Sequence, residues 1–89
     1  MKIIIIKARM THTEADGYVG GVEFEAEGHA SAYEITLQSK KGKDWSYALL
    51  FRDASGKEED IFAVEQLIEE DDELFDRLVK AAKDALYAN

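Results

Sequence analysis

Residues 33–49 have the sequence YEITLQSKKGKDWSYAL, and the expected architecture follows from their pattern. Apolar and polar side chains alternate on both sides of residues 40–42, which is the pattern of two half-buried strands joined by a tight loop. Glycine at the end of such a loop adopts a positive φ without steric cost. The register that this loop implies places Ile35 opposite Tyr47. We therefore expect an antiparallel hairpin with one apolar, aromatic-rich face.

Two more loops that end in glycine, at residues 15–17 and 54–56, extend the pattern in both directions. The first of them places Ala8 opposite Phe24, so that apolar side chains meet across the hairpin. The second predicts one more strand near the middle of the chain. The expected strands are residues 2–14, 18–27, 32–39, 43–53 and 57–64.

The spacing of apolar residues changes after the fifth expected strand from two to about 3.6, which predicts a C-terminal helix over residues 71–87. Asp71 and Asp72 are suited to cap its start, where negative charge is attracted to the positive end of the helix dipole. A second interpretation takes Ser55 and Glu58 as a capping box. That interpretation starts a helix there and removes the fifth strand.

The sequence thus predicts an α+β fold in a single domain over residues 1–89. Its sheet is a bent antiparallel meander of four to five strands, and the C-terminal helix packs on one face. The expected core of the sheet consists of Phe24, Ile35, Leu37, Trp45, Tyr47, Leu49 and Ile61. The helix is expected to contribute Leu74, Phe75, Leu78, Val79 and Ala82.

Composition and charge exclude several functional classes. The chain has no cysteine, which excludes disulfides, thiolate metal sites and cysteine nucleophiles. Its formal net charge of -8 repels a phosphate backbone, so we expect no direct binding of nucleic acid. The run of isoleucines at residues 3–6 is too short for a signal peptide or a membrane span. We expect a cytoplasmic protein without membrane contact.

Candidate catalytic and metal-binding residues lack a supporting motif. His12, Glu14 and Asp16 alternate, so an extended strand would direct all three to one side, and His29 would add a second imidazole. No metal-ligand spacing accompanies them, and no serine occupies a nucleophile elbow. We expect a non-enzymatic protein without cofactor or metal. A small-ligand or metal-dependent enzyme centred on His12 and Glu14 is kept as a third hypothesis.

The outer face of the expected sheet suggests an interface. If Ile4 and Ile6 face the core, Ile3 and Ile5 must point away from it, and an edge strand that is apolar on both sides favours association. The expected register brings other apolar residues to the same outer face. The predicted interface consists of Ile3, Ile5, Ala48, Leu50 and Phe62. The leading hypothesis is therefore a protein-interaction module that self-associates as a homodimer.

A dense acidic run precedes the expected helix. It consists of Glu69, Glu70, Asp71, Asp72, Glu73 and Asp76. Such a run caps a helix and is well solvated, but it also resembles the charge of a phosphate chain. The alternative hypothesis is an acidic inhibitor or nucleic-acid mimic, of the kind carried by phages and mobile elements, which blocks a basic nucleic-acid-binding protein. Binding of that kind weakens steeply with salt, whereas an apolar interface does not.

Overall fold

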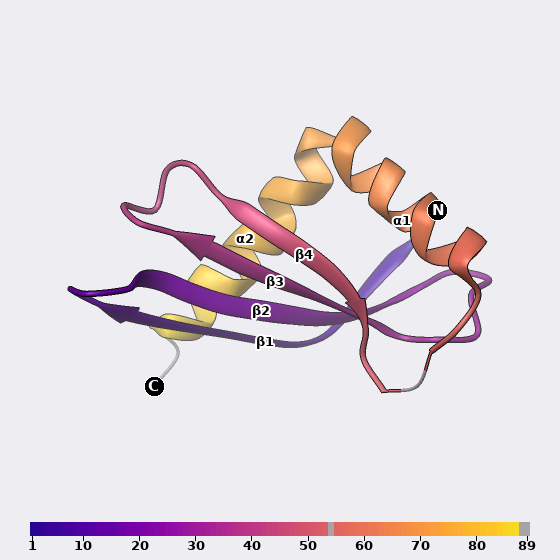
Figure 1. Ribbon diagram of the computed structural model, residues 1–89, viewed down its shortest axis with the longest axis horizontal. Coiled ribbons are helices and arrows are strands. Elements are labelled where there is room, and N and C mark those ends of the chain that lie inside the picture. The colour runs from indigo at the N-terminus through magenta and orange to yellow at the C-terminus, as the bar shows by residue number, and fades with distance from the viewer. Residues whose placement is uncertain (54, 88–89) are drawn as a thin grey trace.

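The computed structural model describes residues 1–53 and 55–87 and places two helices on one side of a four-stranded antiparallel sheet (Figure 1). The strands are β1 (Ile3–Thr13), β2 (Gly17–Ala26), β3 (Tyr33–Ser39) and β4 (Ser46–Phe51), in the order β1-β2-β3-β4. The helices are α1 (Glu58–Glu70) and α2 (Asp72–Leu86). The α+β class and the antiparallel meander are confirmed, but two helices follow the sheet where one was expected.

The expected fifth strand over residues 57–64 is wrong, because this segment lies in α1 and its N-cap. Val64 and Ile68, one helical turn apart, are both buried in the core, and the acidic first turn suits the positive end of a helix dipole. The second interpretation, in which a helix replaces the fifth strand, is therefore correct. Its capping box does not form, because the N-cap is Lys57, which makes no side-chain capping bond.

Asp71 separates the two helices and forms hydrogen bonds with both. Its backbone N–H donates to the Leu67 carbonyl at 2.9 Å, and its side chain accepts from the Leu74 N–H at 3.1 Å. Asp71 is thus the C-cap of α1 and the N-cap of α2. The expected cap at this position is confirmed, and α2 occupies nearly all of the expected residues 71–87.

The register of both hairpins differs from the expected one by two residues. Ile35 pairs with Leu49 rather than Tyr47, and Ala8 pairs with Val22 rather than Phe24. A slip of two residues leaves every side chain on the same face, so the apolar pattern alone does not detect it.

A β-bulge in β1 reverses the faces of its first residues. The register shifts by one between Ile5 and Lys7, so that Ile3 and Ile5 face the core, opposite Ala26 and Phe24. Ile3 is only 5% exposed, whereas Ile4 is 48% exposed. The outward orientation expected of Ile3 and Ile5 is therefore wrong, because the inserted residue breaks the alternation on which that expectation relied.

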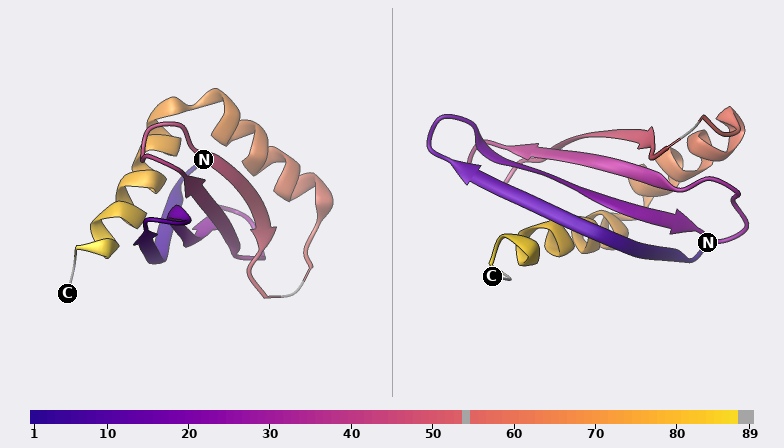
Figure 2. Two further views of the ribbon diagram at one scale, coloured as in Figure 1. Left: turned by 60° about the vertical axis from the view of Figure 1, so that its left-hand side comes forward. Right: turned by 90° about the horizontal axis from the view of Figure 1, so that it is seen from below.

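The core lies between the sheet and the helices. α2 packs mainly over β1 and β2, α1 contacts β4, and the two helices diverge from Asp71 (Figure 2). Of the expected core, Phe24, Ile35 and Leu37 are buried, and Trp45, Tyr47, Leu49 and Ile61 are partly buried against it. The expected helix residues Leu74, Leu78, Val79 and Ala82 are buried, and Phe75 is partly so. No helix of the described residues covers the opposite face of the sheet.

Candidate functional site

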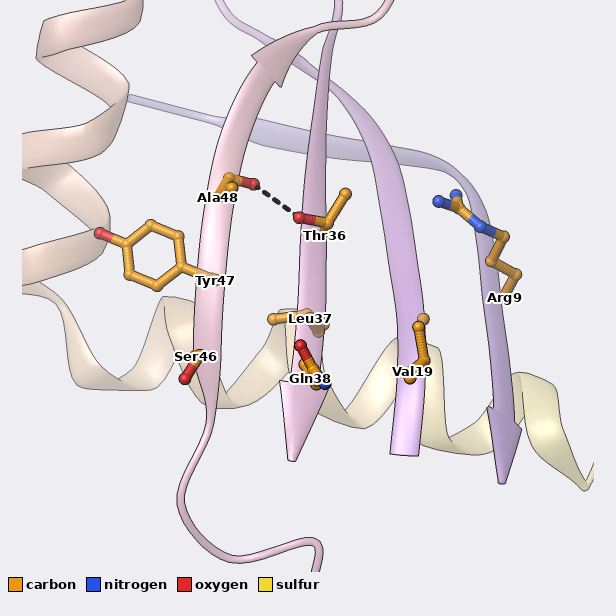
Figure 3. Close-up of a pocket in the computed structure, with 9 residues that line it drawn as sticks. Arg9, Val19, Thr36, Leu37, Gln38, Ser46, Tyr47 and Ala48 are labelled. Carbon is orange, nitrogen blue, oxygen red and sulfur yellow. Dashed lines mark hydrogen bonds between the residues drawn. The ribbon is translucent and has the colours of Figure 1, made fainter. Parts of the chain in front are cut away.

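The helix-free face of the sheet is the candidate site. Successive side chains of a strand alternate between faces, so residues that pair across the sheet form rows on this face. One row consists of Arg9, Gly21, Thr36 and Ala48, with one residue from each strand. Because Thr36 and Ala48 are small, a shallow depression of about 310 Å³ lies along this row (Figure 3).

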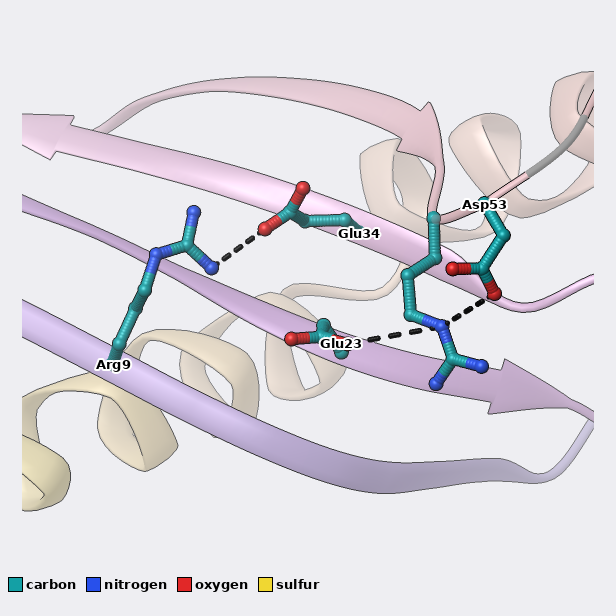
Figure 4. A network of polar contacts seen from close by, with 5 residues as sticks. Arg9, Glu23, Glu34 and Asp53 are labelled. Carbon is teal, nitrogen blue, oxygen red and sulfur yellow. Dashed lines mark hydrogen bonds and ion pairs between the residues drawn. The ribbon is translucent and has the colours of Figure 1, made fainter.

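An arginine crosses the sheet beside this depression. The Arg9 Nη1 atom on β1 lies 2.6 Å from Glu34 Oε2 on β3, so the side chain spans the intervening strand β2 (Figure 4). A Cβ atom at Gly21 would lie within 2.8 Å of the guanidinium group. Glycine at this position therefore makes room for the Arg9–Glu34 pair.

A second charged cluster lies toward the end of β4. The Arg52 Nε atom lies 2.9 Å from Asp53 Oδ2 and 3.7 Å from Glu23 Oε1 (Figure 4). The hydrogen bond to Asp53 raises the pKa of Arg52 above its usual value. Two clusters of opposite charge on this face are thus ion-paired, whereas Lys7 and Glu25, which lie on the same face, form no ion pair with a described residue.

Apolar side chains surround these charged pairs. Ile4 on β1, Val19 on β2 and Leu50 on β4 point away from the helices, and each is between two-fifths and one-half exposed. Ile6, at the bulge, is exposed to a similar extent. Large aliphatic groups exposed on a sheet face favour contact with another protein surface.

The structure brings together only two residues of the predicted interface. Ala48 and Leu50 both lie on the helix-free face, on β4. Ile3 and Ile5 face the core instead, and Phe62 lies on α1, where its side chain is 62% exposed. The surface through Ile3, Ile5 and Phe62 therefore does not exist as one face.

Sequence reasoning missed the depression and the arginine that crosses the sheet. The signal available was the pair Gly20 and Gly21 in the middle of a strand, because glycine inside a strand marks a close approach of other atoms. The same pair suggests a bulge in β2, but the bulge lies in β1 at Ile6. The expectation that Ile4 and Ile6 face the core depends on unbroken alternation along β1, which the bulge interrupts.

The acidic run lies at the junction of the two helices. Glu69 and Glu70 end α1, Asp71 is the cap, and Asp72, Glu73 and Asp76 follow in α2, all of them exposed. Four more carboxylates precede the run in α1, at Glu58, Glu59, Asp60 and Glu65, and residues 58–76 contain no lysine or arginine. We call residues 58–76 the acidic arm.

One carboxylate of the acidic arm is bound to the sheet. The Tyr47 hydroxyl of β4 donates to Glu69 Oε2 at 2.5 Å, which ties the end of α1 to the edge strand. Burial, together with the hydrogen bond and the charge of Glu69, raises the pKa of Tyr47 from 10.0 to about 12. The fold therefore favours the neutral phenol, and this part of the stability is present below pH 10 and is lost as the pH rises to about 12.

We expect Tyr47→Phe to remove this pH dependence. Thermal melts from neutral pH to about pH 12 should show the wild type losing more stability above pH 10 than the variant does. Tyr87→Phe, which alters an exposed tyrosine, is the matched control and should follow the wild type. Parallel curves for the wild type and Tyr47→Phe would contradict the assignment.

The two histidines have aromatic partners. The His12 ring stacks on Tyr18 with centroids 4.3 Å apart, and His29 Nδ1 lies 2.8 Å from the Tyr33 hydroxyl. His12 lies near the β1–β2 loop and His29 in the β2–β3 loop, at opposite ends of β2. Residues 1–53 and 55–87 contain no group of three or more histidine and carboxylate side chains placed to hold a metal ion.

No protein-family model, curated protein or solved structure gives a significant match to this chain. Within the described residues, neither helix combines the length and the apolar character needed to span a membrane.

Proposed function

We propose that this protein is a non-enzymatic protein-interaction module that associates with a second copy through the helix-free face of its sheet. The observation that carries this proposal is the exposure of Ile4, Val19 and Leu50 on a face that no helix of the described residues covers. Covering such side chains removes apolar surface from water, which favours association by roughly 25 cal/mol per Å².

The charged groups of this face are compatible with burial in an interface. Arg9 is paired with Glu34, and Arg52 with Glu23 and Asp53, so a second copy does not have to supply counter-charges for the two arginines. Lys7 and Glu25 on the same face form no ion pair with a described residue, so they have to stay in contact with water or pair with the second copy. Removing these pairs from water still costs free energy. We therefore expect an association of modest strength that depends on the apolar side chains around the pairs.

Leu50→Glu should abolish this association. We expect light scattering on a dilution series at high salt to show a wild-type dimer and a monomeric variant, because an apolar contact survives the screening of exposed charges. Phe62→Ser is the matched control: it removes an exposed apolar side chain from α1 and should leave the dimer intact. A wild type that stays monomeric at every concentration would overturn the proposal.

The acidic arm supports a second candidate function. Most of its carboxylates are exposed along two consecutive helices, and residues 58–76 contain no lysine or arginine, a pattern that suits a mimic of a phosphate chain. Its partner would be a basic nucleic-acid-binding protein. Capture of such a protein at low salt and its release at high salt would favour this function, whereas a salt-resistant homodimer favours the first.

A further inference from the structure

A groove lies on the helix side of the molecule, between the β3–β4 connection and the second half of α2. Its volume is about 550 Å³, which is ample for one aromatic side chain. Its apolar lining comes from Trp45, Val79 and Tyr87, and its cationic lining from Lys43, Lys80 and Lys83. Lysine side chains placed around aromatic rings suit a guest that is both apolar and anionic.

Two of the lysines are free to receive an anion. Lys80 Nζ lies 2.7 Å from Asp84 Oδ2, one turn further along α2, so its charge is already matched. Lys43 and Lys83 form no ion pair with any described residue. Asp76 also lines the groove, and it would repel an anionic guest on that side. The open cationic side of the groove is therefore the one that carries Lys43 and Lys83.

The acidic arm carries a guest of this chemistry. Phe62 on α1 is 62% exposed, although a solvated helix face gains nothing from a phenyl ring. Glu58 lies four residues before it and Glu65 three residues after it, so both carboxylates flank the ring on the same side of the helix. Both are exposed.

The Phe62 ring does not reach the groove of its own chain. The first turns of α1 lie at one end of the molecule, whereas the β3–β4 connection and the end of α2 lie at the other (Figures 1 and 2). The longest dimension of the molecule is 38 Å. A Phe62 side chain that enters the groove would therefore have to come from another molecule.

We propose that the groove binds the acidic arm of a second copy, with Phe62 between Trp45 and Tyr87 and with Glu58 and Glu65 toward Lys43 and Lys83. The contact is head-to-tail, because each copy offers one arm and one groove. Repetition of such a contact builds rings or filaments rather than closed dimers. This contact is separate from the dimer proposed on the helix-free face, and it does not depend on that dimer.

Two complementary variants test this contact, each made with Leu50→Glu to remove association through the sheet. The first adds Phe62→Ser, which disables the arm and leaves the groove. The second adds Lys43→Glu and Lys83→Glu, which disable the groove and leave the arm. We expect each variant alone to be monomeric at an ionic strength of about 0.15 M. Their mixture should form a one-to-one complex that grows no further.

The dissociation constant gives the size of the effect. In the Leu50→Glu background, we expect Phe62→Ser to weaken self-association at least about tenfold, as loss of an aromatic anchor does. Ile6→Ser, which removes an exposed apolar side chain outside the arm and the groove, should leave it unchanged. A mixture of the two complementary variants that stays monomeric would overturn the proposal, and so would self-association of either variant as strong as that of the Leu50→Glu parent.

Discussion

Ile3→Asp is expected to unfold the protein, whereas Ile4→Asp is expected to leave it folded. Ile3 is 5% exposed and packs in the core opposite Ala26, and Ile4 is 48% exposed on the other face. A buried carboxylate without a partner costs about 4 kcal/mol or more, and the whole free energy of unfolding of a domain is roughly 5–15 kcal/mol. The cation beside this position, Arg77, already donates to the Ile3 carbonyl at 3.1 Å, so an ion pair with a new carboxylate would compete with that hydrogen bond. Both variants lose the same strand propensity, about 1 kcal/mol at most.

Urea unfolding monitored by circular dichroism measures the difference between these variants. The wild type and Ile4→Asp should have similar midpoints, and Ile3→Asp should be unfolded or close to it without denaturant. The opposite order would show that β1 alternates without a bulge, with Ile4 rather than Ile3 in the core. The comparison therefore tests the orientation that decides which isoleucines are free for an interface.

Gly20→Ala should destabilise the protein by about 3 kcal/mol, whereas Gly21→Ala should change its stability by about 1 kcal/mol or less. A Cβ atom at Gly20 would lie 2.3 Å from the Arg9 carbonyl oxygen, so the backbone of β1 has to move. At Gly21 the nearest atoms belong to the guanidinium group of the Arg9 side chain, which has room to rotate away into solvent.

Differential scanning calorimetry of the two variants measures this contrast, because the same substitution is made at adjacent positions of one strand. Gly21→Ala should also displace Arg9 from Glu34, so Arg9→Ala should have a smaller effect on stability in that background than in the wild type. Equal destabilisation by the two glycine substitutions would show that the close contact with the β1 backbone at Gly20 is absent.

The first two hairpins show which structural features a sequence pattern predicts and which it does not. Alternation placed Phe24, Ile35 and Leu37 on one face, and they are buried there, but the pairing register was two residues off in both hairpins. Alternation predicts which face of the sheet a side chain occupies. A register shift of two residues leaves that face unchanged, so alternation does not detect it. Asp71 was identified as a cap because its side-chain chemistry acts within three residues along the chain.

Residues 57–64 illustrate a local ambiguity. Ile61 and Val64 fit one face of a helix, and alternation also allowed a strand that pairs with β4. Packing of Val64 and Ile68 in the core resolves this in favour of the helix. This difference changes the candidate site, because Phe62 lies on the acidic arm and not on the sheet face where a strand would place it.

Sequence patterns suffice to predict the α+β class, the antiparallel meander, the faces of β2, β3 and β4, and the C-terminal helix with its cap. These depend on periodicity and on side-chain chemistry within a few residues. Three other features depend on tertiary packing: the bulge at Ile6, the passage of Arg9 over Gly21 and the groove beside Trp45. Each of these arises where segments distant in sequence pack together, so no local pattern encodes it, and each determines which side chains are left for binding.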